Sequence, residues 1–374
     1  MAGIYIHIPF CKKACHYCNF HFSTSQQLMP EMVKAICKEA AIQQSYLTEK
    51  VETIYFGGGT PSLSTKYQIQ STIDTLRELF DVADDAEISL EANPDDITEE
   101  KLTGWKEAGI NRLSIGIQSF FEDDLQWMNR AHNAQQAMQC IELAQKIGFA
   151  NITIDLIYGT PALTDEKWKQ NVVTALSLNI PHLSCYALTV EPKTALAKMI
   201  TTQQSENVDA DKQARHFLLL TQWMSEAGFE HYEISNFALP RFRSKHNSSY
   251  WQGKPYLGLG PSAHSFNGIS RQWNIANNSL YLKSIETGTL PFEVEVLTET
   301  QQLNEYIMTS LRTIEGISLK RVAESWGDEK KILLINTAQK HITCGHLVLV
   351  NDILQLGADG KFLADGIAAD LFTV

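Results

Sequence analysis

The 374-residue sequence predicts an α/β protein with a parallel sheet, either open or curled into a barrel, followed by a small α+β unit. Three observations predict this class. Short β-prone runs alternate with helical stripes, and the connections between them are short. Glycine followed by an apolar residue repeatedly ends a helical stretch just before the next strand, as at Gly109, Gly148 and Gly228. From about residue 297 the pattern changes to short helices and one pair of strands.

The individual elements follow from hydrophobic periodicity. Strands are expected over residues 4–8, 53–56, 87–90, 112–117, 151–157, 182–188 and 231–234. Helices are expected over residues 29–47, 67–80 and 165–178, and over a segment capped by Thr98 and stopped by Gly109. The C-terminal unit is expected to have helices over 298–313, 319–326 and 330–341 and strands over 347–350 and 353–356. Residues 239–275 show no helical or strand period, and we expect a long functional loop there.

Composition narrows the function classes. The chain has 31 basic and 43 acidic residues, a net charge of −12, and such a surface repels nucleic-acid phosphates. No apolar run approaches the roughly 18 residues that span a bilayer, so no membrane insertion is expected. The segment before Cys11 is too short for a signal peptide, and we expect a cytoplasmic protein. Cysteines are reduced in that compartment, so clustered ones are expected to hold metal.

Three cysteines form the strongest motif. Cys11, Cys15 and Cys18 lie within eight residues just after the first strand, so their thiolates can face one point. Soft thiolates favour an iron–sulfur cluster or zinc. A [4Fe-4S] cluster normally takes four cysteines, so three leave one iron open to another ligand. The alternative is a closed zinc site completed by His16 or His21.

Other polar residues follow neighbouring strands. A glycine run, Gly57 to Gly59, ends the second strand, where backbone N–H groups can approach a ligand or simply form a tight turn. Glu91, Gln118 and Asp155 lie at or near the ends of later strands. In a parallel βα array these ends share one face, so we expect one common ligand site there.

Several motifs occur in order along nearly the whole chain. They are Tyr5-Ile6-His7-Ile8-Pro9-Phe10-Cys11, Cys15-His16-Tyr17-Cys18, Gly57-Gly58-Gly59-Thr60-Pro61, Glu91-Ala92-Asn93-Pro94, Gly116-Ile117-Gln118-Ser119 and Asp155-Leu156-Ile157-Tyr158-Gly159. With them the sequence resembles the radical S-adenosylmethionine superfamily. The branch it resembles is the anaerobic coproporphyrinogen III oxidase-like family, closest to its HemW-type haem chaperones.

The resemblance implies a fold and a set of site residues. Cys11, Cys15 and Cys18 would ligate three irons of a [4Fe-4S] cluster whose fourth iron binds S-adenosylmethionine. The nucleotide site would be lined by Tyr5, Tyr17, Gly58, Gly59, Thr60, Glu91, Gln118, Arg130 and Asp155. In this superfamily the reduced cluster cleaves the sulfonium to a 5′-deoxyadenosyl radical, which a closed site must shield. The implied domains are a partial (βα)6 barrel over residues 1–236, an aromatic and glycine-rich segment over 237–290 that completes the site, and a small, mostly helical α+β domain over 291–374.

Two features separate the members of this branch. The oxidase carries a fourth cysteine two residues beyond the third, where this chain has Phe20. The segment His246-Asn247-Ser248-Ser249-Tyr250-Trp251 matches the His-Asn-x-x-Tyr-Trp motif of the chaperones. Histidine is a common axial ligand of haem iron, and aromatic rings suit a flat porphyrin. His246 is therefore a candidate haem ligand; the alternative is a histidine that only packs in an aromatic loop.

The resemblance thus implies a haem chaperone that binds haem, a [4Fe-4S] cluster and S-adenosylmethionine and transfers haem to acceptor proteins, respiratory proteins among them. A homodimer is also expected. The alternative is oxidative decarboxylation of coproporphyrinogen III, which the missing fourth cysteine puts in doubt, so the status of the chain as an enzyme stays open. A third class is a metal-bearing regulator without radical chemistry.

Overall fold

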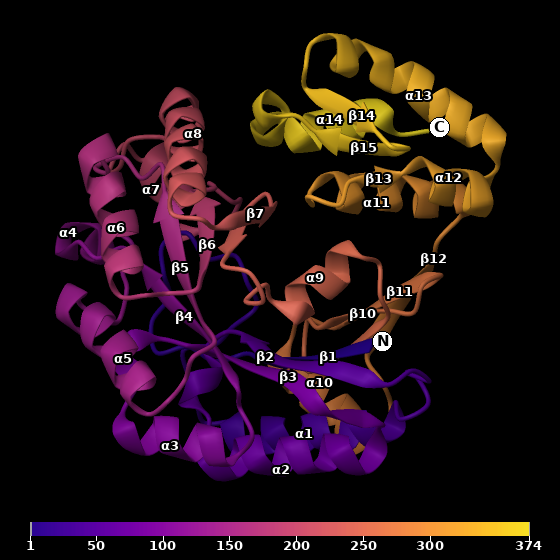
Figure 1. Cartoon of the computed structure of the whole chain (residues 1–374). Coiled ribbons are helices and arrows are strands. Elements are labelled where there is room, and N and C mark those ends of the chain that lie inside the picture. The colour runs from indigo at the N-terminus through magenta and orange to yellow at the C-terminus, as the bar shows by residue number, and fades with distance from the viewer. Residues whose placement is uncertain (1, 374) are drawn as a thin grey trace.

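A curved sheet of six parallel strands forms the centre of the molecule (Figure 1). The computed structural model describes residues 2–373. The parallel strands are adjacent in sequence order, from β1 to β6. Their bounds are β1 (Ala2–Ile8), β2 (Val51–Gly58), β3 (Val82–Ala92), β4 (Arg112–Gln118), β5 (Ile152–Tyr158) and β6 (His182–Ala187). The α/β class and the partial barrel are therefore confirmed.

Helices cover the outer side of this sheet (Figure 1). They are α1 (Met29–Ile42), α2 (Lys66–Leu79), α3 (Glu99–Glu107), α5 (Ala134–Lys146), α6 (Asp165–Ser177) and α8 (Ala210–Glu226). Two shorter helices, α4 (Glu122–Trp127) and α7 (Ala195–Thr201), lie in the segments that follow β4 and β6. Thr65 and Asn133 cap α2 and α5 with reciprocal capping boxes, which fixes where these helices begin.

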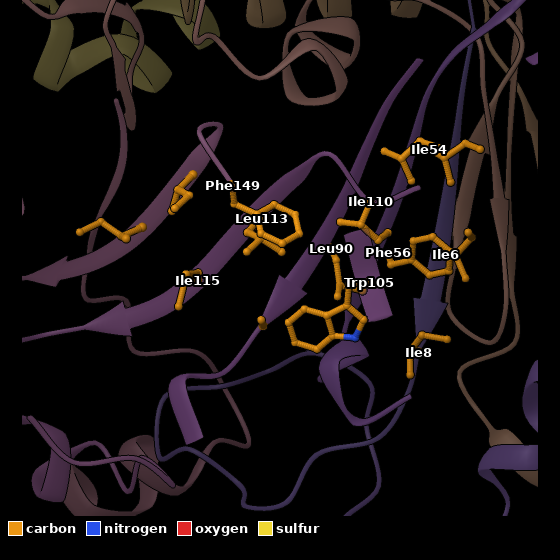
Figure 2. Close-up of a cluster of buried hydrophobic side chains, with 14 of the residues drawn as sticks. Ile6, Ile8, Ile54, Phe56, Leu90, Trp105, Ile110, Leu113, Ile115 and Phe149 are labelled. Carbon is orange, nitrogen blue, oxygen red and sulfur yellow. The ribbon is translucent and has the colours of Figure 1, made fainter. Parts of the chain in front are cut away.

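Alternation along the strands separates the core from the site. Ile6, Ile54, Phe56 and Leu90 are buried and pack with Trp105 of α3 between sheet and helices (Figure 2). Successive side chains of a strand point to opposite faces, so the residues between these core positions face the inside of the barrel. These inward positions include Tyr5, His7, Tyr55, Glu91 and Asp155. The hydrophobic pattern thus positions the polar residues of the site.

Further strands extend the sheet at both edges. At one edge β9 (Tyr256–Leu259) pairs parallel with β1 and is followed by antiparallel β10 (His264–Phe266), β11 (Ser270–Asn274) and β12 (Phe292–Val296). At the other edge β6 is followed by β8 (Asn236–Ala238) and β7 (Glu230–Glu233).

The structure corrects the expectation of an irregular loop over residues 239–275. It contains α9 (Lys245–Trp251) and strands β9 to β11, and α10 (Asn278–Glu286) follows it. These elements have three to nine residues, too few for a periodic signal. β9 pairs with β1, β10 and β11 extend the sheet from β9, and α10 packs on α1. Such tertiary contacts are not recorded in local sequence.

A second apolar core lies in the C-terminal segment, with Leu303, Ile307, Leu334 and Leu354 among its buried residues. Its elements are α11 (Glu299–Leu311), β13 (Ile317–Ser318), α12 (Leu319–Trp326), α13 (Asp328–Thr343), β14 (Leu347–Val350), β15 (Ile353–Leu356) and α14 (Ala364–Leu371). The predicted domain boundary at residue 291 stays a prediction. β12, which follows this boundary, belongs to the large sheet. Between residues 2 and 373, no helix combines the length and apolarity that crossing a membrane requires.

Candidate functional site

A cavity of about 460 Å³ lies at the carboxyl ends of the parallel strands. All three motif cysteines line it, together with Tyr17, Gly58, Gly59, Thr60, Glu91, Gln118, Arg130 and Asp155. Eight of the nine residues predicted for the nucleotide site are therefore brought together. Tyr5 is the exception, because it lines a second cavity described below.

The cysteine loop is held by backbone hydrogen bonds. Cys11 N–H donates to Ser23 O at 3.0 Å, and Cys18 N–H donates to Cys15 O at 3.3 Å. The three thiols are half-buried and form no disulfide. Burial raises the pKa of Cys11 to about 11 and also raises the pKa of Cys18. Thiols in this state bind metal only with loss of the proton, which a soft cation drives.

The zinc alternative does not fit this geometry. His16 Nδ1 is 2.8 Å from Trp127 O and His21 Nε2 is 2.7 Å from Asn278 Oδ1, but each ring keeps a second nitrogen, so these bonds do not by themselves exclude zinc. No group of three or more His, Cys, Asp or Glu side chains within residues 2–373 is placed to hold a single metal ion. Zinc needs four ligands that converge on one atom, whereas the cysteines of an iron–sulfur cluster each bind a different iron. The loop therefore suits a cluster better than one ion.

The glycine run at the end of β2 is required by close backbone contact. Gly59 N–H donates to Ile8 O at 2.9 Å, and a Cβ at Gly59 would lie 2.7 Å from three backbone atoms of Ile8 and Phe10. Gly58 has φ +101°, in the left-handed region that favours glycine. The glycine run thus lets the end of β2 contact the backbone at the start of the cysteine loop. This close contact explains the glycines better than a tight turn does.

Arg130 reaches into the cavity with donor capacity to spare. Its Nη2 donates to Asn93 Oδ1 at 2.7 Å and to Gly116 O at 2.8 Å, and its Nη1 donates to Cys15 Sγ at 3.2 Å. Among the described residues, nothing accepts from the buried Nε. A guanidinium fixed by these bonds at the cavity wall brings a positive charge that suits the carboxylate of a ligand.

Two carboxyl groups face the same space. Tyr55 Oη donates to Glu91 Oε1 at 2.9 Å, and Gly58 N–H donates to Glu91 Oε2 at 3.2 Å. Burial and the neighbouring Asp155 raise the pKa of Glu91 to about 7, and burial raises the pKa of Asp155 to about 7. A ligand that brings an ammonium, a sulfonium or hydroxyl donors would stabilise both carboxylates. Anion and cation sites thus lie in one cavity beside the three thiols.

The lining also includes Gln118 and three residues that the sequence did not assign to the site. Gln118 ends β4 with φ +66°, a strained conformation for a residue with a side chain, at an irregularity in the β4–β5 register. Asn93, which orients Arg130, and Ser114 and Tyr186 also line the cavity. Asn93 and Ser114 could have been found from the sequence, because Asn93 is two residues from Glu91 and Ser114 is two residues from the motif residue Gly116.

A second cavity of about 880 Å³ opens beside the first. Phe20, Glu91 and Tyr186 line both cavities. Its wall is built by β1, β2, α9, β9 to β11 and the C-terminal helices α11 and α12, and it mixes aromatic rings with polar and charged side chains. The rings include Tyr5, Tyr55, Tyr250, Trp251, Tyr256, Phe266, Tyr306 and Trp326. The structure thus places Tyr5 and the candidate haem ligand His246 here, away from the cysteines.

His246 is fully buried, and both of its ring nitrogens are engaged. Nδ1 lies 2.8 Å from Thr53 Oγ1, and Nε2 lies 2.8 Å from Tyr250 Oη. Glu87 accepts from the backbone N–H groups of Lys245 and His246 at 3.1 Å, which anchors the start of α9. The assignment of His246 as haem ligand stays a prediction, and binding iron would require His246 to give up one of these hydrogen bonds.

Comparisons with known proteins agree with this geometry. Residues 5–172 match the family model of the Radical SAM superfamily. The chain is 36% identical over 338 residues to the heme chaperone HemW of Bacillus subtilis, covering 87% of each chain. It is 33% identical over 375 residues to the heme chaperone HemW of Mycobacterium tuberculosis, covering 99% of this chain and 94% of the other.

A solved structure shows the same fold. Coproporphyrinogen III oxidase (HemN) from Escherichia coli, a radical SAM enzyme, superposes with a TM-score of 0.85 at 23% identity, covering 100% of this chain and 90% of that one. At this identity the likeness speaks for the fold alone. The relatives with more than 30% identity, matched over most of both chains, show the family: this chain belongs to the HemW heme chaperone family within the Radical SAM superfamily.

Proposed function

We propose that this protein binds haem and passes it to acceptor proteins. One observation carries the proposal: the chain is 33% identical, over 99% of its length, to a protein named heme chaperone HemW. The second cavity supports it, because its volume of about 880 Å³ lies in the range of small-molecule sites and its wall carries several aromatic rings together with polar and charged side chains. A flat apolar macrocycle with carboxylate arms needs a site of this kind.

We also propose that the first cavity holds a [4Fe-4S] cluster and S-adenosylmethionine. Cys11, Cys15 and Cys18 would bind three irons, and Arg130 would hold the carboxylate of the nucleotide. Glu91 would accept from its ammonium, and Asp155 from ribose hydroxyls. Tyr17 would pack against the adenine, with Gly58, Gly59, Thr60 and Gln118 lining the remainder. When bound, such a cluster supplies one-electron chemistry at the sulfonium.

Metal loading tests the first cavity. Iron and sulfide are measured after anaerobic reconstitution of the wild type and of a variant with Cys11, Cys15 and Cys18 changed to serine. The wild type is expected to bind four irons and the variant almost none. The exposed Cys344 offers a matched control, since Cys344→Ser should load like the wild type. A four-iron signature that survives loss of all three cysteines would refute the assignment.

Haem titration tests the function. Reconstituted protein is expected to bind haem near one to one by absorbance, and to deliver it to an added apo-protein acceptor. Incubation with coproporphyrinogen III, a reductant and S-adenosylmethionine should give no protoporphyrinogen at turnover rates. Turnover without stable haem binding would show the decarboxylase instead. Acceptor identity, homodimer formation and cytoplasmic location stay predictions.

A further inference from the structure

Three histidines line the second cavity, and two of them have no free nitrogen. His246 is bonded to Thr53 and Tyr250 as described above. His7 is also buried; its Nδ1 lies 3.2 Å from Tyr5 Oη and its Nε2 lies 2.9 Å from His21 O. Iron binds through the lone pair of an imidazole nitrogen, so a ring with both nitrogens engaged must first break a hydrogen bond.

His264 is the third histidine of this cavity, and it differs from the other two. It lies on β10 and is exposed, and no hydrogen bond or ion pair engages its ring in the part of the chain that the structure describes. The ring is held by Trp273, its partner across the β10–β11 pair, with centroids 6.1 Å apart and planes 28° apart. Ser265 is buried on the opposite face, so His264 and Phe266 point to the cavity side together.

We propose that His264, rather than His246, supplies the imidazole nitrogen that binds haem iron in the second cavity. This inference rests on the proposed function, namely that the protein binds haem. The coordinate bond forms from the nitrogen lone pair to the iron, and no buried hydrogen bond breaks. At His246 the same bond would leave a buried hydroxyl of Thr53 or Tyr250 without its partner, which costs free energy.

The charge around His264 favours its binding form. Partial burial and the nearby Arg271 lower its pKa, which favours the neutral ring that carries the lone pair. Arg271 itself is paired with Glu305, its Nη2 lying 2.7 Å from Oε2. The lowered pKa and the lack of a hydrogen bond to the ring from any described residue both favour iron binding at this histidine.

Arg321 is placed for the carboxylate arms of haem. Its guanidinium lies over the ring of Tyr306 at 4.4 Å, on the C-terminal side of the same cavity. Unlike Arg271, it forms no ion pair with any described residue. A cation fixed on an aromatic face and open to a carboxylate suits a haem propionate. His264 and Arg321 thus supply an iron ligand and an anion partner on two walls of one cavity.

Two probes separate these roles. Ferric haem and iron-free protoporphyrin are titrated into wild type, His264→Ala, His246→Ala and Arg321→Gln, with His346→Ala as a control outside the cavity. His264→Ala is expected to weaken ferric haem at least tenfold and to shift its Soret band, while leaving iron-free porphyrin unchanged. Arg321→Gln should weaken both porphyrins alike. His346→Ala should match the wild type.

The outcomes distinguish the inference from the function on which it rests. A wild type that binds neither porphyrin overturns the proposed function. If the wild type binds haem, the variants decide which histidine binds the iron. His264→Ala with the wild-type haem affinity and Soret band, together with loss of both in His246→Ala, overturns only the role of His264. Equal loss of haem and iron-free porphyrin in His264→Ala would show packing rather than iron binding. Thermal unfolding of each variant confirms that the fold is intact.

Discussion

Gly59 shows how a single missing side chain shapes the site. Its backbone touches Ile8 and Phe10 so closely that a Cβ would lie 2.7 Å from three backbone atoms. Backbone cannot move aside as a flexible side chain can, so the two loops of the first cavity meet only because no Cβ is present.

Gly59→Ala should therefore destabilise the protein and disturb metal loading. We expect a loss of about 1–3 kcal/mol in the free energy of unfolding, measured by urea denaturation. Gly366→Ala in α14 is the control, because its Cβ would meet nothing within 4 Å. In a helix that change should be neutral or stabilising by up to about 1 kcal/mol. Equal behaviour of the two variants would contradict the packing argument.

Arg130 is a second residue whose exact chemistry matters. Arg130→Lys keeps the charge but loses the planar fork that bonds Asn93, Gly116 and Cys15 together. We expect the affinity of reconstituted protein for S-adenosylmethionine to fall about tenfold or more in equilibrium binding, since bonds to charged groups contribute about 1.5–3 kcal/mol. Arg243→Lys, at a partly exposed ion pair, should leave this affinity unchanged. An unchanged affinity in Arg130→Lys would remove Arg130 from the nucleotide site.

At the scale of elements, one buried carboxyl joins α1 to the added strands. Glu39 Oε2 accepts from Gly260 N–H at 2.7 Å and from Tyr281 Oη at 2.6 Å. Its Oε1 accepts from Asn274 Nδ2 at 2.6 Å and from Gln43 Nε2 at 3.0 Å. These partners lie after β9, on β11, on α10 and just after α1, so Glu39 holds together elements that build the wall of the second cavity.

Glu39→Gln places an amide donor against donors and should destabilise the protein by about 2 kcal/mol or more. Its pH dependence has a defined sign. Burial raises the pKa of Glu39 from 4.5 to about 7, so the folded protein binds a proton that the unfolded chain releases. This group's contribution to stability is full below about pH 4.5 and is lost as pH rises to about 7.

Urea unfolding at several pH values checks both statements. The wild type should lose this part of its stability between pH 4.5 and 7, and Glu39→Gln should lack that slope. Glu286→Gln, at an exposed position of α10, serves as control. A variant with the wild-type slope would show that another group produces it.

At the scale of the molecule, the two cavities share a wall. Phe20, Glu91 and Tyr186 line both, and Phe20 and Tyr186 are 65% and 42% exposed. We expect a ligand in one cavity to order these side chains, which would leave a ligand in the other with less entropy to lose. The first cavity lies within the barrel, whereas the second needs the C-terminal helices as well.

Binding in the two cavities should therefore be positively coupled. We expect S-adenosylmethionine to tighten haem binding about fivefold, or about 1 kcal/mol, and haem to tighten S-adenosylmethionine binding by the same factor. Calorimetric titration in both orders measures this. Phe20→Ala should reduce the coupling between the two ligands more than it reduces the affinity for either ligand measured alone. Additive binding, with no coupling in either order, would show that the shared wall does not respond to ligands.

The first cavity was largely predictable from sequence. Cys11 to Cys18 are close by chain connectivity. Gly58 ends β2, Glu91 is next to the last residue of β3 and Asp155 lies within β5, and all three line the same cavity. Asn93, two positions from Glu91, and Ser114, two positions from the motif residue Gly116, were within reach of the same alternation argument. Local spacing and strand order suffice where every lining residue belongs to one βα series.

The sequence by itself determined the α/β class, the cysteine loop and most of the nucleotide-site residues, because periodicity and motif spacing are local properties. Only the tertiary structure decided the second cavity, the place of Tyr5, and the contrast between buried His246 and free His264. These depend on β9 pairing with β1 and on the C-terminal helices lying beside α9. Such contacts join segments up to 250 residues or so apart, and their energy comes from burial and pairing that no local pattern records.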